Sequence, residues 1–242
     1  MDWFLANSGM VLERAGQHLV LALVPMVLGL VISIPLAQLA RRHAVLRSVV
    51  LTASSLLYTI PSLALFIILP TILGTRILDP LNVVVALTVY AVALLVRAAL
   101  DAFDSVDKDV SQAAVAMGYK PLVRFLKVDL PLSLPVMFAG LRVVSVSNIS
   151  LVSVSALLGV GNLGMLFTDG LQRDFVTEVV VGIVAILVLA LVMDAILVLL
   201  ERILTPWERA GRRGSTQGID TTADAADAAL RLAEPKTGGG NA

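Results

Sequence analysis

The chain has 242 residues, of which 58% are hydrophobic and 15% are charged, and its mean hydropathy is +0.92. Soluble domains carry charge on about 25% of their residues, so this composition indicates a polytopic membrane protein. The net charge is +0 and cysteine is absent, which excludes disulfides, thiolate metal sites and cysteine nucleophiles and gives no sign of a nucleic-acid partner. His18 and His43, the two histidines, leave little scope for metal chemistry, and we expect no metal site.

Residues 1–17 form the first predicted element. The segment begins with Trp3 and Phe4 and continues with apolar residues such as Leu5 and Leu12. Aromatic rings favour the membrane–water interface. We therefore expect a short interfacial helix with an aromatic anchor on the extracytoplasmic side.

Five apolar stretches follow, each long enough to cross a bilayer of about 30 Å as a helix. Their apolar residues are continuous rather than alternating, which predicts helices and not strands. The predicted spans are residues 18–39, 48–73, 81–99, 132–158 and 175–200. The predicted fold class is therefore all-α, with a transmembrane domain over residues 18–210.

Basic residues are distributed unevenly over the predicted loops. Twelve of them follow spans one, three and five, namely Arg41, Arg42, Arg47, Arg97, Lys108, Lys120, Arg124, Lys127, Arg202, Arg209, Arg212 and Arg213. Three, Arg14, Arg76 and Arg173, fall on the opposite side. Cytoplasmic loops are enriched in Lys and Arg, so we expect the N-terminus outside and the C-terminus in the cytoplasm.

The second predicted span contains polar and aromatic candidates for a substrate path, Tyr58, Pro61 and Ser62. Pro61 removes one helix hydrogen bond and would free a carbonyl within the span, which suits a bend that lines a path. The alternative is a tolerated kink in which Ser and Thr hydroxyls bond back to their own helix.

The longest predicted cytoplasmic loop, residues 100–131, is typical of two short helices joined by a turn. Asp109 and Gln112 have the spacing of a capping box, which predicts a helix that starts at Asp109. Gly118 can end this helix in a left-handed turn, and Pro121 suits the start of the second helix.

The same loop carries a long motif with fixed spacing. Its parts, in order, are Gln112, Ala113, Ala114, three residues, Gly118, nine residues, Val128, Asp129, Leu130 and Pro131. The motif resembles the EAA motif of ABC-importer permeases, with Gln112 where that family usually has Glu. The resemblance implies a type I ABC-importer permease fold and a helix over residues 109–117 that docks on a separate ATPase subunit. The alternative is an ordinary helix-turn-helix connector.

The resemblance also implies which residues couple ATP hydrolysis to transport. They are Asp109, Gln112, Ala113, Ala114, Gly118, Arg124, Leu130 and Pro131. The small alanine side chains would let another surface approach the helix closely.

The fourth predicted span is polar on two sides. At about 100° per residue, Ser145, Asn148 and Ser155 share one arc, while three further serines lie on another. Such a helix should lie inside a bundle rather than face lipid. Asn148 is the best path candidate, because an amide without a partner in hydrocarbon is costly. Its alternative role is a hydrogen bond between helices.

Two charged residues fall within predicted spans, Arg142 in span four and Asp194 in span five. Intramembrane charges usually pair, so we expect an Arg142–Asp194 pair near an inner gate. The alternative is that each side chain extends separately to the interface.

The remaining segments give no enzyme signature. Residues 159–164 match G-x-G-x-x-G but follow a membrane helix instead of a strand, so we interpret them as a turn into a short extracytoplasmic segment. No P-loop motif occurs, so ATP and Mg²⁺ should bind to a partner and not to this chain. Residues 211–242 are small, polar and rich in Gly, which predicts a disordered cytoplasmic tail.

Three shorter segments resemble osmoprotectant permeases of the glycine betaine/carnitine/choline type: residues 58–65, residues 140–142 and residues 159–164. The resemblance implies a multi-pass inner-membrane permease without enzymatic activity of its own. It would work with ABC ATPase subunits, a second permease that is identical or related, and an extracytoplasmic substrate-binding protein. Aromatic faces recognise quaternary amines, and Tyr58, Phe66 and Tyr90 are the candidates, with core packing as their alternative role.

Other functions remain open from the sequence. A permease for another small solute such as methionine would keep the architecture and change the substrate. An ion-coupled secondary carrier would need more than one carboxylate at the membrane midplane. An intramembrane serine hydrolase would need a histidine well inside the bilayer, and a simple membrane anchor would not need the loop motif.

Overall fold

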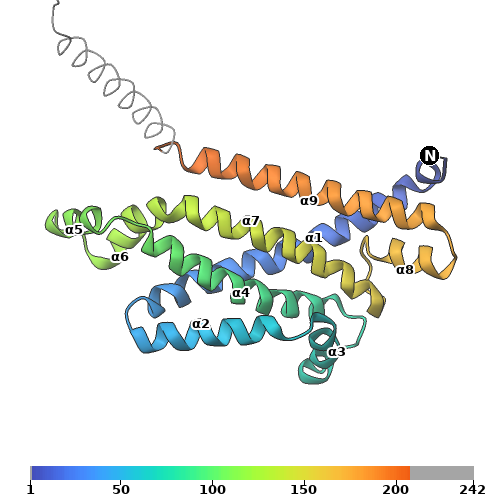
Figure 1. Cartoon of the computed structure of the whole chain (residues 1–242), viewed down its shortest axis with the longest axis horizontal. Helices are drawn as coiled ribbons and strands as arrows, with labels where there is room; N and C mark the ends of the chain where they lie inside the picture. Colours follow the sequence, from blue (N-terminus) through green and yellow to red (C-terminus); the bar gives the residue numbers. More distant parts are fainter. Residues whose placement is uncertain (1, 208–242) are drawn as a thin grey trace, which may run out of the picture. The chain divides into compact units, whose positions relative to one another are not determined.

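The computed structural model describes residues 2–207, and all regular structure in that range is helical (Figure 1). The elements are α1 (Asp2–Ala40), α2 (Ala44–Thr59), α3 (Ser62–Leu73), α4 (Pro80–Asp104), α5 (Lys108–Ala116), α6 (Pro121–Arg124), the π-helix η1 (Phe125–Asp129), α7 (Leu130–Val154), the 3₁₀-helix η2 (Ser155–Leu158), α8 (Met165–Gln172) and α9 (Val176–Leu204). The predicted tail over residues 211–242 lies outside the described residues.

Two compact units make up the chain, Met1–Glu201 and Arg202–Ala242. The described part of the second unit is the last turn of α9 and residues 205–207. The helical bundle belongs to the first unit, and the packing described below is within it.

Within residues 2–207, four helical segments are long and apolar enough to cross a membrane unaided. They are α1, α4, the run from Pro121 to Leu158 that includes α7, and α9. Each coincides with one of the predicted spans, so the all-α transmembrane fold class is confirmed.

The second predicted span is not one straight helix. It is divided into α2 and α3, whose axes differ by 100°. Pro61 lies at the break because it lacks an N–H and disfavours helical backbone in the residue before it, and Ile60 accordingly has an extended ψ of 128°. The hydroxyl of Tyr90 on α4 donates a hydrogen bond of 2.6 Å to the Ile60 carbonyl oxygen. The predicted apolar segment over residues 48–73 is therefore a bent pair of helices, with the bend at the predicted Pro61, and the Ile60 carbonyl at the break has a partner.

The N-terminal segment is not a separate short helix either. α1 runs without interruption from Asp2 to Ala40 and contains both Pro25 and Pro35. The Trp3 ring lies edge-on to the Phe175 ring just before α9, with the centroids 5.8 Å apart. The predicted interfacial segment is thus the first part of a helix of 39 residues.

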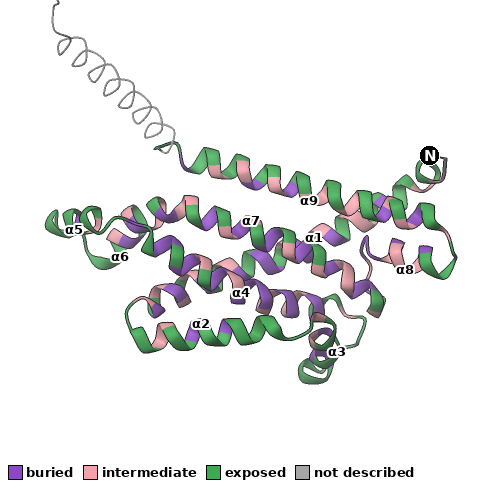
Figure 2. Cartoon of the chain, viewed as in Figure 1, coloured by how far each residue is buried: buried purple, intermediate pink, exposed green. Residues whose placement is uncertain are grey.

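The central element is α4, which packs against α1, α2, α3 and α7. Its side chains are buried along nearly its whole length, whereas α2, α3 and α9 leave large faces exposed (Figure 2). Leu87, Leu95 and Phe103 are fully buried. The burial pattern places α4 inside the chain and leaves the other helices to meet lipid or another subunit.

Small residues let the central helices approach closely. A Cβ atom built on Gly29 of α1 would lie 2.6 Å from the Cβ atom of Ala91 on α4. Gly140 of α7 meets Ala98 of α4 in the same way. Lipid tails are as apolar as the side chains, so the hydrophobic effect contributes little to helix association in a membrane. Close van der Waals packing is therefore a main source of that association.

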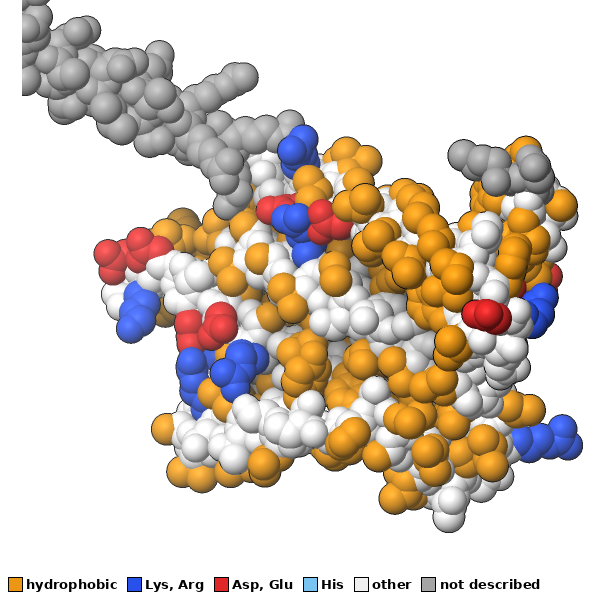
Figure 3. Space-filling view, turned by 45° about the vertical axis from the view of Figure 1, so that its right-hand side comes forward, with side chains coloured by type: hydrophobic (Ala, Val, Ile, Leu, Met, Phe, Trp, Pro, Cys, Tyr) orange, Lys and Arg blue, Asp and Glu red, His pale blue; other side chains and the backbone are white. Residues whose placement is uncertain are grey.

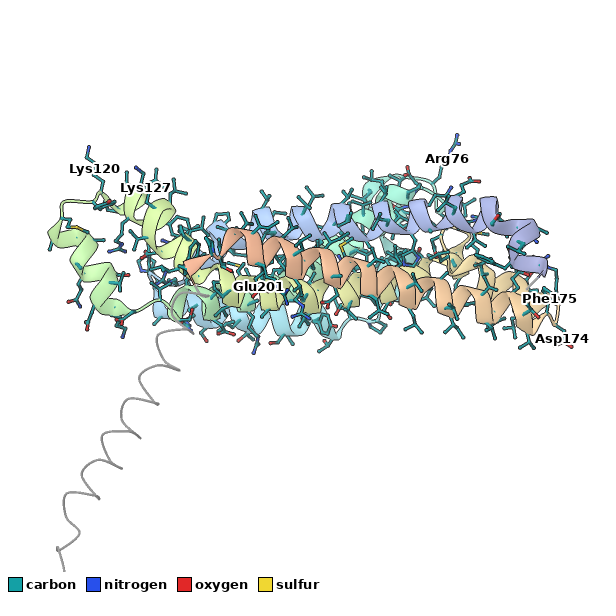
Figure 4. All side chains as sticks on the ribbon, turned by 90° about the horizontal axis from the view of Figure 1, so that it is seen from above. Arg76, Lys120, Lys127, Asp174, Phe175 and Glu201 are labelled. Atoms are coloured by element: carbon teal, nitrogen blue, oxygen red, sulfur yellow. The ribbon has the colours of Figure 1, made fainter. Side chains whose placement is uncertain are left out.

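Polar loops lie at both ends of the bundle. Lys120 and Lys127 lie at one end, and Arg76, Asp174 and Phe175 lie toward the other (Figure 4). Apolar side chains cover much of the face between them, with acidic and basic side chains gathered in a few groups (Figure 3). The segments from α5 to η1 therefore project beyond the apolar part of the bundle.

Candidate functional site

The first helix of the predicted coupling loop is α5, and its N-cap is Asp107. The Asp107 carboxylate accepts a hydrogen bond of 2.8 Å from the Asp109 amide. Asp109 is already helical and lies in the first turn, where its negative charge interacts favourably with the helix dipole and stabilises the helix. The expected cap at Asp109 is wrong, because the cap lies at Asp107, two residues earlier than the Asp109–Gln112 spacing suggested.

Gly118 ends α5 in the predicted left-handed turn, with φ +81°. The Gly118 amide donates to the Val115 carbonyl at 2.9 Å, and the Tyr119 amide donates to the Ala114 carbonyl at 3.1 Å. These two bonds form a Schellman motif, which satisfies carbonyls that the helix end would leave free. A residue with a side chain is disfavoured at this φ, so Gly118 fixes the direction in which the chain leaves α5.

The second helix, α6, begins with Pro121 at its first position and continues through η1 into α7. The Phe125 ring packs edge-on against Phe103 at the end of α4, with the centroids 5.4 Å apart. This contact ties the loop to the central helix of the bundle.

Asp129 holds the two parts of the loop together, a role that the sequence analysis missed. Its carboxylate is 1% exposed and accepts a hydrogen bond of 2.9 Å from the Ser111 hydroxyl on α5. Its other oxygen lies 3.3 Å from Nε of Arg124 on α6. The available signal was an acidic residue directly before Leu130 and Pro131, where a span begins.

The outward side of the loop is unusually apolar. Met117 is 70% exposed and Leu122 is 69% exposed. The other exposed apolar residues here are Val110, Val115, Tyr119, Val123 and Leu126. A loop with this many exposed apolar side chains is typical of a docking surface.

The motif residues divide between this surface and the interior. Gln112 and Ala113 are exposed, whereas Ala114 is 1% exposed and lies against its own chain. Leu130 and Pro131 are half-buried where α7 begins. A bulky residue at Ala114 would therefore disturb the loop itself as well as any partner.

The path candidates on α2 and α3 lie at the break between these helices. Tyr58 is 45% exposed, Pro61 is exposed, and Ser62 opens α3. The hydroxyls of Ser55 and Thr59 donate to carbonyls of the preceding turn, at 3.0 and 2.7 Å. The bend and the hydroxyls bonded back to the helix, which the sequence offered as alternatives, therefore occur together.

The path candidates on α7 are buried within this chain. Asn148 is 1% exposed, and its amide donates to the Ala22 carbonyl of α1 at 3.2 Å. Ser155 accepts a hydrogen bond of 3.1 Å from Asn162, and Ser145 is also buried. Asn148 thus makes a hydrogen bond between helices, while Ser150 on the other polar arc is exposed.

The two predicted intramembrane charges lie together. Arg142 of α7 donates from Nε and one terminal nitrogen to the two carboxylate oxygens of Asp194 on α9, at 2.6 and 2.9 Å. Both side chains are partly exposed, so the pair lies at the edge of the bundle. Forked contacts of this kind fix orientation as well as distance.

No group of three or more His, Cys, Asp or Glu side chains capable of holding a metal occurs among residues 2–207. His18 is fully buried, and its Nε2 atom lies 2.9 Å from the Ile149 carbonyl oxygen. The distinctive geometry of the described chain is thus a loop with an apolar outer surface and a bundle with polar groups inside it.

Solved structures share this fold. One is described as inward-facing conformations of the MetNI methionine ABC transporter, with a TM-score of 0.68, 21% identity, and coverage of 82% of this chain and 96% of that chain. Another is described as an amino acid ABC transporter with histidines, with a TM-score of 0.69, 14% identity and the same coverages.

Curated relatives are similar over nearly their whole length. The chain is 34% identical over 209 residues to the osmoprotectant import permease protein OsmW of Salmonella typhimurium, covering 85% of this chain and 97% of OsmW. It is 27% identical over 206 residues to the glycine betaine/carnitine/choline transport system permease protein OpuCB of Bacillus subtilis, covering 85% of this chain and 94% of that protein.

A family model matches most of the transmembrane domain. The match runs over residues 29–206, which include the break at Pro61, the loop from α5 to η1 and the Arg142–Asp194 pair. The chain therefore belongs to the family of binding-protein-dependent transport system inner membrane components, and it is the membrane-spanning permease of an ABC importer.

Proposed function

We propose that this permease imports osmoprotectants, with quaternary amines such as glycine betaine as substrates. The observation that carries the proposal is the 34% identity to an osmoprotectant import permease along 97% of that protein. Relatives named for glycine betaine, carnitine and choline transport support the same substrate class. The methionine and amino acid transporters are similar in fold at identities too low to indicate a substrate.

The chain would contribute a path and a mechanical link, while separate subunits bind ATP and Mg²⁺ and hydrolyse the nucleotide. The exposed apolar surface around Met117 and Leu122 would dock on the ATPase. Because Asp129 joins α5 to α6 and Phe125 joins the loop to α4, a displacement of α5 would reach the centre of the bundle. The coupling residues Asp109, Gln112, Ala113, Ala114, Gly118, Arg124, Leu130 and Pro131 would act in this link.

The assembly would contain a second permease, because α2, α3 and α9 leave broad faces uncovered and polar groups at the break reach the surface of the chain. An extracytoplasmic binding protein would deliver the substrate. The N-terminus would lie outside and the C-terminus in the cytoplasm, and the end marked by Lys120 and Lys127 would then lie on the cytoplasmic side. In that assembly, the exposed break at Tyr58, Pro61 and Ser62 would face the path.

Reconstitution in liposomes tests the proposal. The permease would be combined with the ATPase and the binding protein encoded beside it, and uptake of labelled glycine betaine would be measured with and without ATP. Uptake that requires both ATP and the binding protein supports the proposal. Uptake driven by an ion gradient without ATP would contradict it, and ATP-dependent uptake of methionine but not betaine would replace the substrate class.

A further inference from the structure

Arg97 does not lie in a loop, although it was counted above with the basic residues that follow the third predicted span. It is part of α4, about 10 Å before the end of that helix. Its side chain reaches α2, where a terminal nitrogen donates a hydrogen bond of 2.8 Å to the Ser55 hydroxyl. The guanidinium is therefore held at the level of Ser55, well inside the span formed by α2.

The charge of Arg97 is not neutralised within the part of the chain that the structure describes. No carboxylate among the described residues pairs with it, in contrast to Arg47, Arg124 and Arg142. Arg97 and Ser55 are both exposed on the surface of the chain. An unpaired guanidinium at this depth is costly against lipid, so this face must border a water-filled path or another polar group. Ser55 occupies one N–H of the guanidinium, which leaves others free for an anion.

An exposed aromatic ring lies one turn further along α2. Tyr58 is 45% exposed, whereas Phe66 and Tyr90, the two other aromatic candidates, are 0% and 3% exposed. The Tyr90 ring supports Tyr58 edge-on, with the centroids 5.9 Å apart. Tyr90 is itself held by its hydrogen bond to Ile60. Tyr58 thus presents a positioned ring face rather than a freely rotating one.

We propose that Arg97 and Tyr58 form a contact site for a small zwitterion within the translocation path. The carboxylate of the substrate binds the Arg97 guanidinium, and its quaternary ammonium packs on the Tyr58 ring. Ser55 and Tyr58 are three residues apart on one face of α2, a rise of about 4.5 Å, which suits a cation and a carboxylate on one small molecule. This inference rests on the proposed function and goes beyond it, because it assigns the two ends of the substrate to two residues.

The test compares a zwitterion with a cation. In the reconstituted importer, uptake of glycine betaine and of choline, which has no carboxylate, is measured per ATP hydrolysed. Arg97→Gln should lower betaine uptake at least tenfold and leave choline uptake within about twofold of the wild type, since a charge-assisted forked contact contributes roughly 1.5–3 kcal/mol. Arg97→Lys should retain part of the betaine uptake, because the charge remains and the fork is lost.

The ring is tested separately. Tyr58→Leu should lower uptake of both substrates, and Tyr58→Phe should retain both, because the aromatic face is what binds the ammonium group. Arg42→Gln is the matched control, since Arg42 is exposed in the link between α1 and α2, and it should change neither uptake. ATP hydrolysis stimulated by the loaded binding protein should persist in the Arg97 variants.

Three results would overturn the inference. In the first, Arg97→Gln leaves betaine uptake unchanged. In the second, Arg97→Gln lowers betaine uptake, choline uptake and stimulated ATP hydrolysis to the same extent, as a purely structural role of Arg97 would. Tyr58→Leu could transport both substrates normally. If the wild type transports neither quaternary amine, the proposed function itself fails, so the two failures are distinguishable.

Discussion

Gly118 allows a test in which the magnitude follows from the structure. Its φ of +81° lies in the left-handed region, and a Cβ atom added there would meet nothing within 4 Å. Substitution therefore costs backbone strain alone, without a steric clash. For Ala the strain is about 1–2 kcal/mol, which corresponds to roughly a 5- to 30-fold loss in the population of the turn. Asn tolerates this region better, and a β-branched residue tolerates it worse.

Uptake per ATP hydrolysed should consequently be highest in Gly118→Asn, lower in Gly118→Ala and lowest in Gly118→Val. The amount of protein in the membrane should stay constant, because the turn lies outside the spanning helices. Reconstituted transport, ATP hydrolysis and quantitative immunoblotting of membranes measure the three quantities. Gly9→Ala is the matched control, since a Cβ atom there also meets nothing within 4 Å and the backbone is helical, so its uptake should be unchanged.

The reasoning fails if Gly118→Val transports as well as Gly118→Asn, because strain then does not determine coupling. It also fails if all three variants lose the protein from the membrane in parallel with transport, since the turn would then support the bundle and not the docking of α5.

Three further predictions concern the loop and the charge pair. Asp129→Asn keeps an acceptor for Ser111 on α5 but loses the charge that faces Arg124 on α6, so the stability of the loop should fall by about 1–2 kcal/mol. This loss should appear as faster amide hydrogen exchange in α5, while the transmembrane helices keep their protection. Arg142→Asp and Asp194→Arg should each impair uptake, and the double exchange should recover part of it; absence of recovery would contradict a functional pair. Leu122→Asp should weaken co-purification of the ATPase, whereas Leu171→Asp, at an even more exposed leucine on α8, should not.

The spanning helices could be predicted from the sequence because lipid demands long apolar runs whatever the tertiary packing. The break between α2 and α3 could only be anticipated as a bend at Pro61. The structure adds its size, 100°, and a hydrogen bond from Tyr90 to the Ile60 carbonyl at the break. That partner comes from another helix and has no local signal.

The loop shows the same division between local and distant determinants. Gly118 was predictable because a left-handed turn needs a residue without a side chain. The cap was not, because Asp107 and Asp109 are chemically equal candidates and only backbone dihedrals decide between them. Asp129 was missed because its importance comes from burial, which brings Ser111 and Arg124 to a residue that resembles any loop carboxylate.

The sequence shows that α7 is polar on two sides, but it does not show which side lies toward the interior of the chain and which lies outward. Asn148 and Ser155 lie toward their own chain, and Ser150 lies outward. Both arcs have similar residue types, so only the packing of α1 and α4 against α7 separates them.

The divided span also constrains the order in which the protein is made. α2 has 16 residues and α3 has 12, so they extend about 24 and 18 Å, and neither alone covers a hydrocarbon core of about 30 Å. During synthesis both must therefore enter the bilayer together as one apolar segment. The Ile60 carbonyl acquires its donor only when α4, which is translated later, arrives with Tyr90. The hydrogen bond at the break is thus completed only by a helix that is translated after α3.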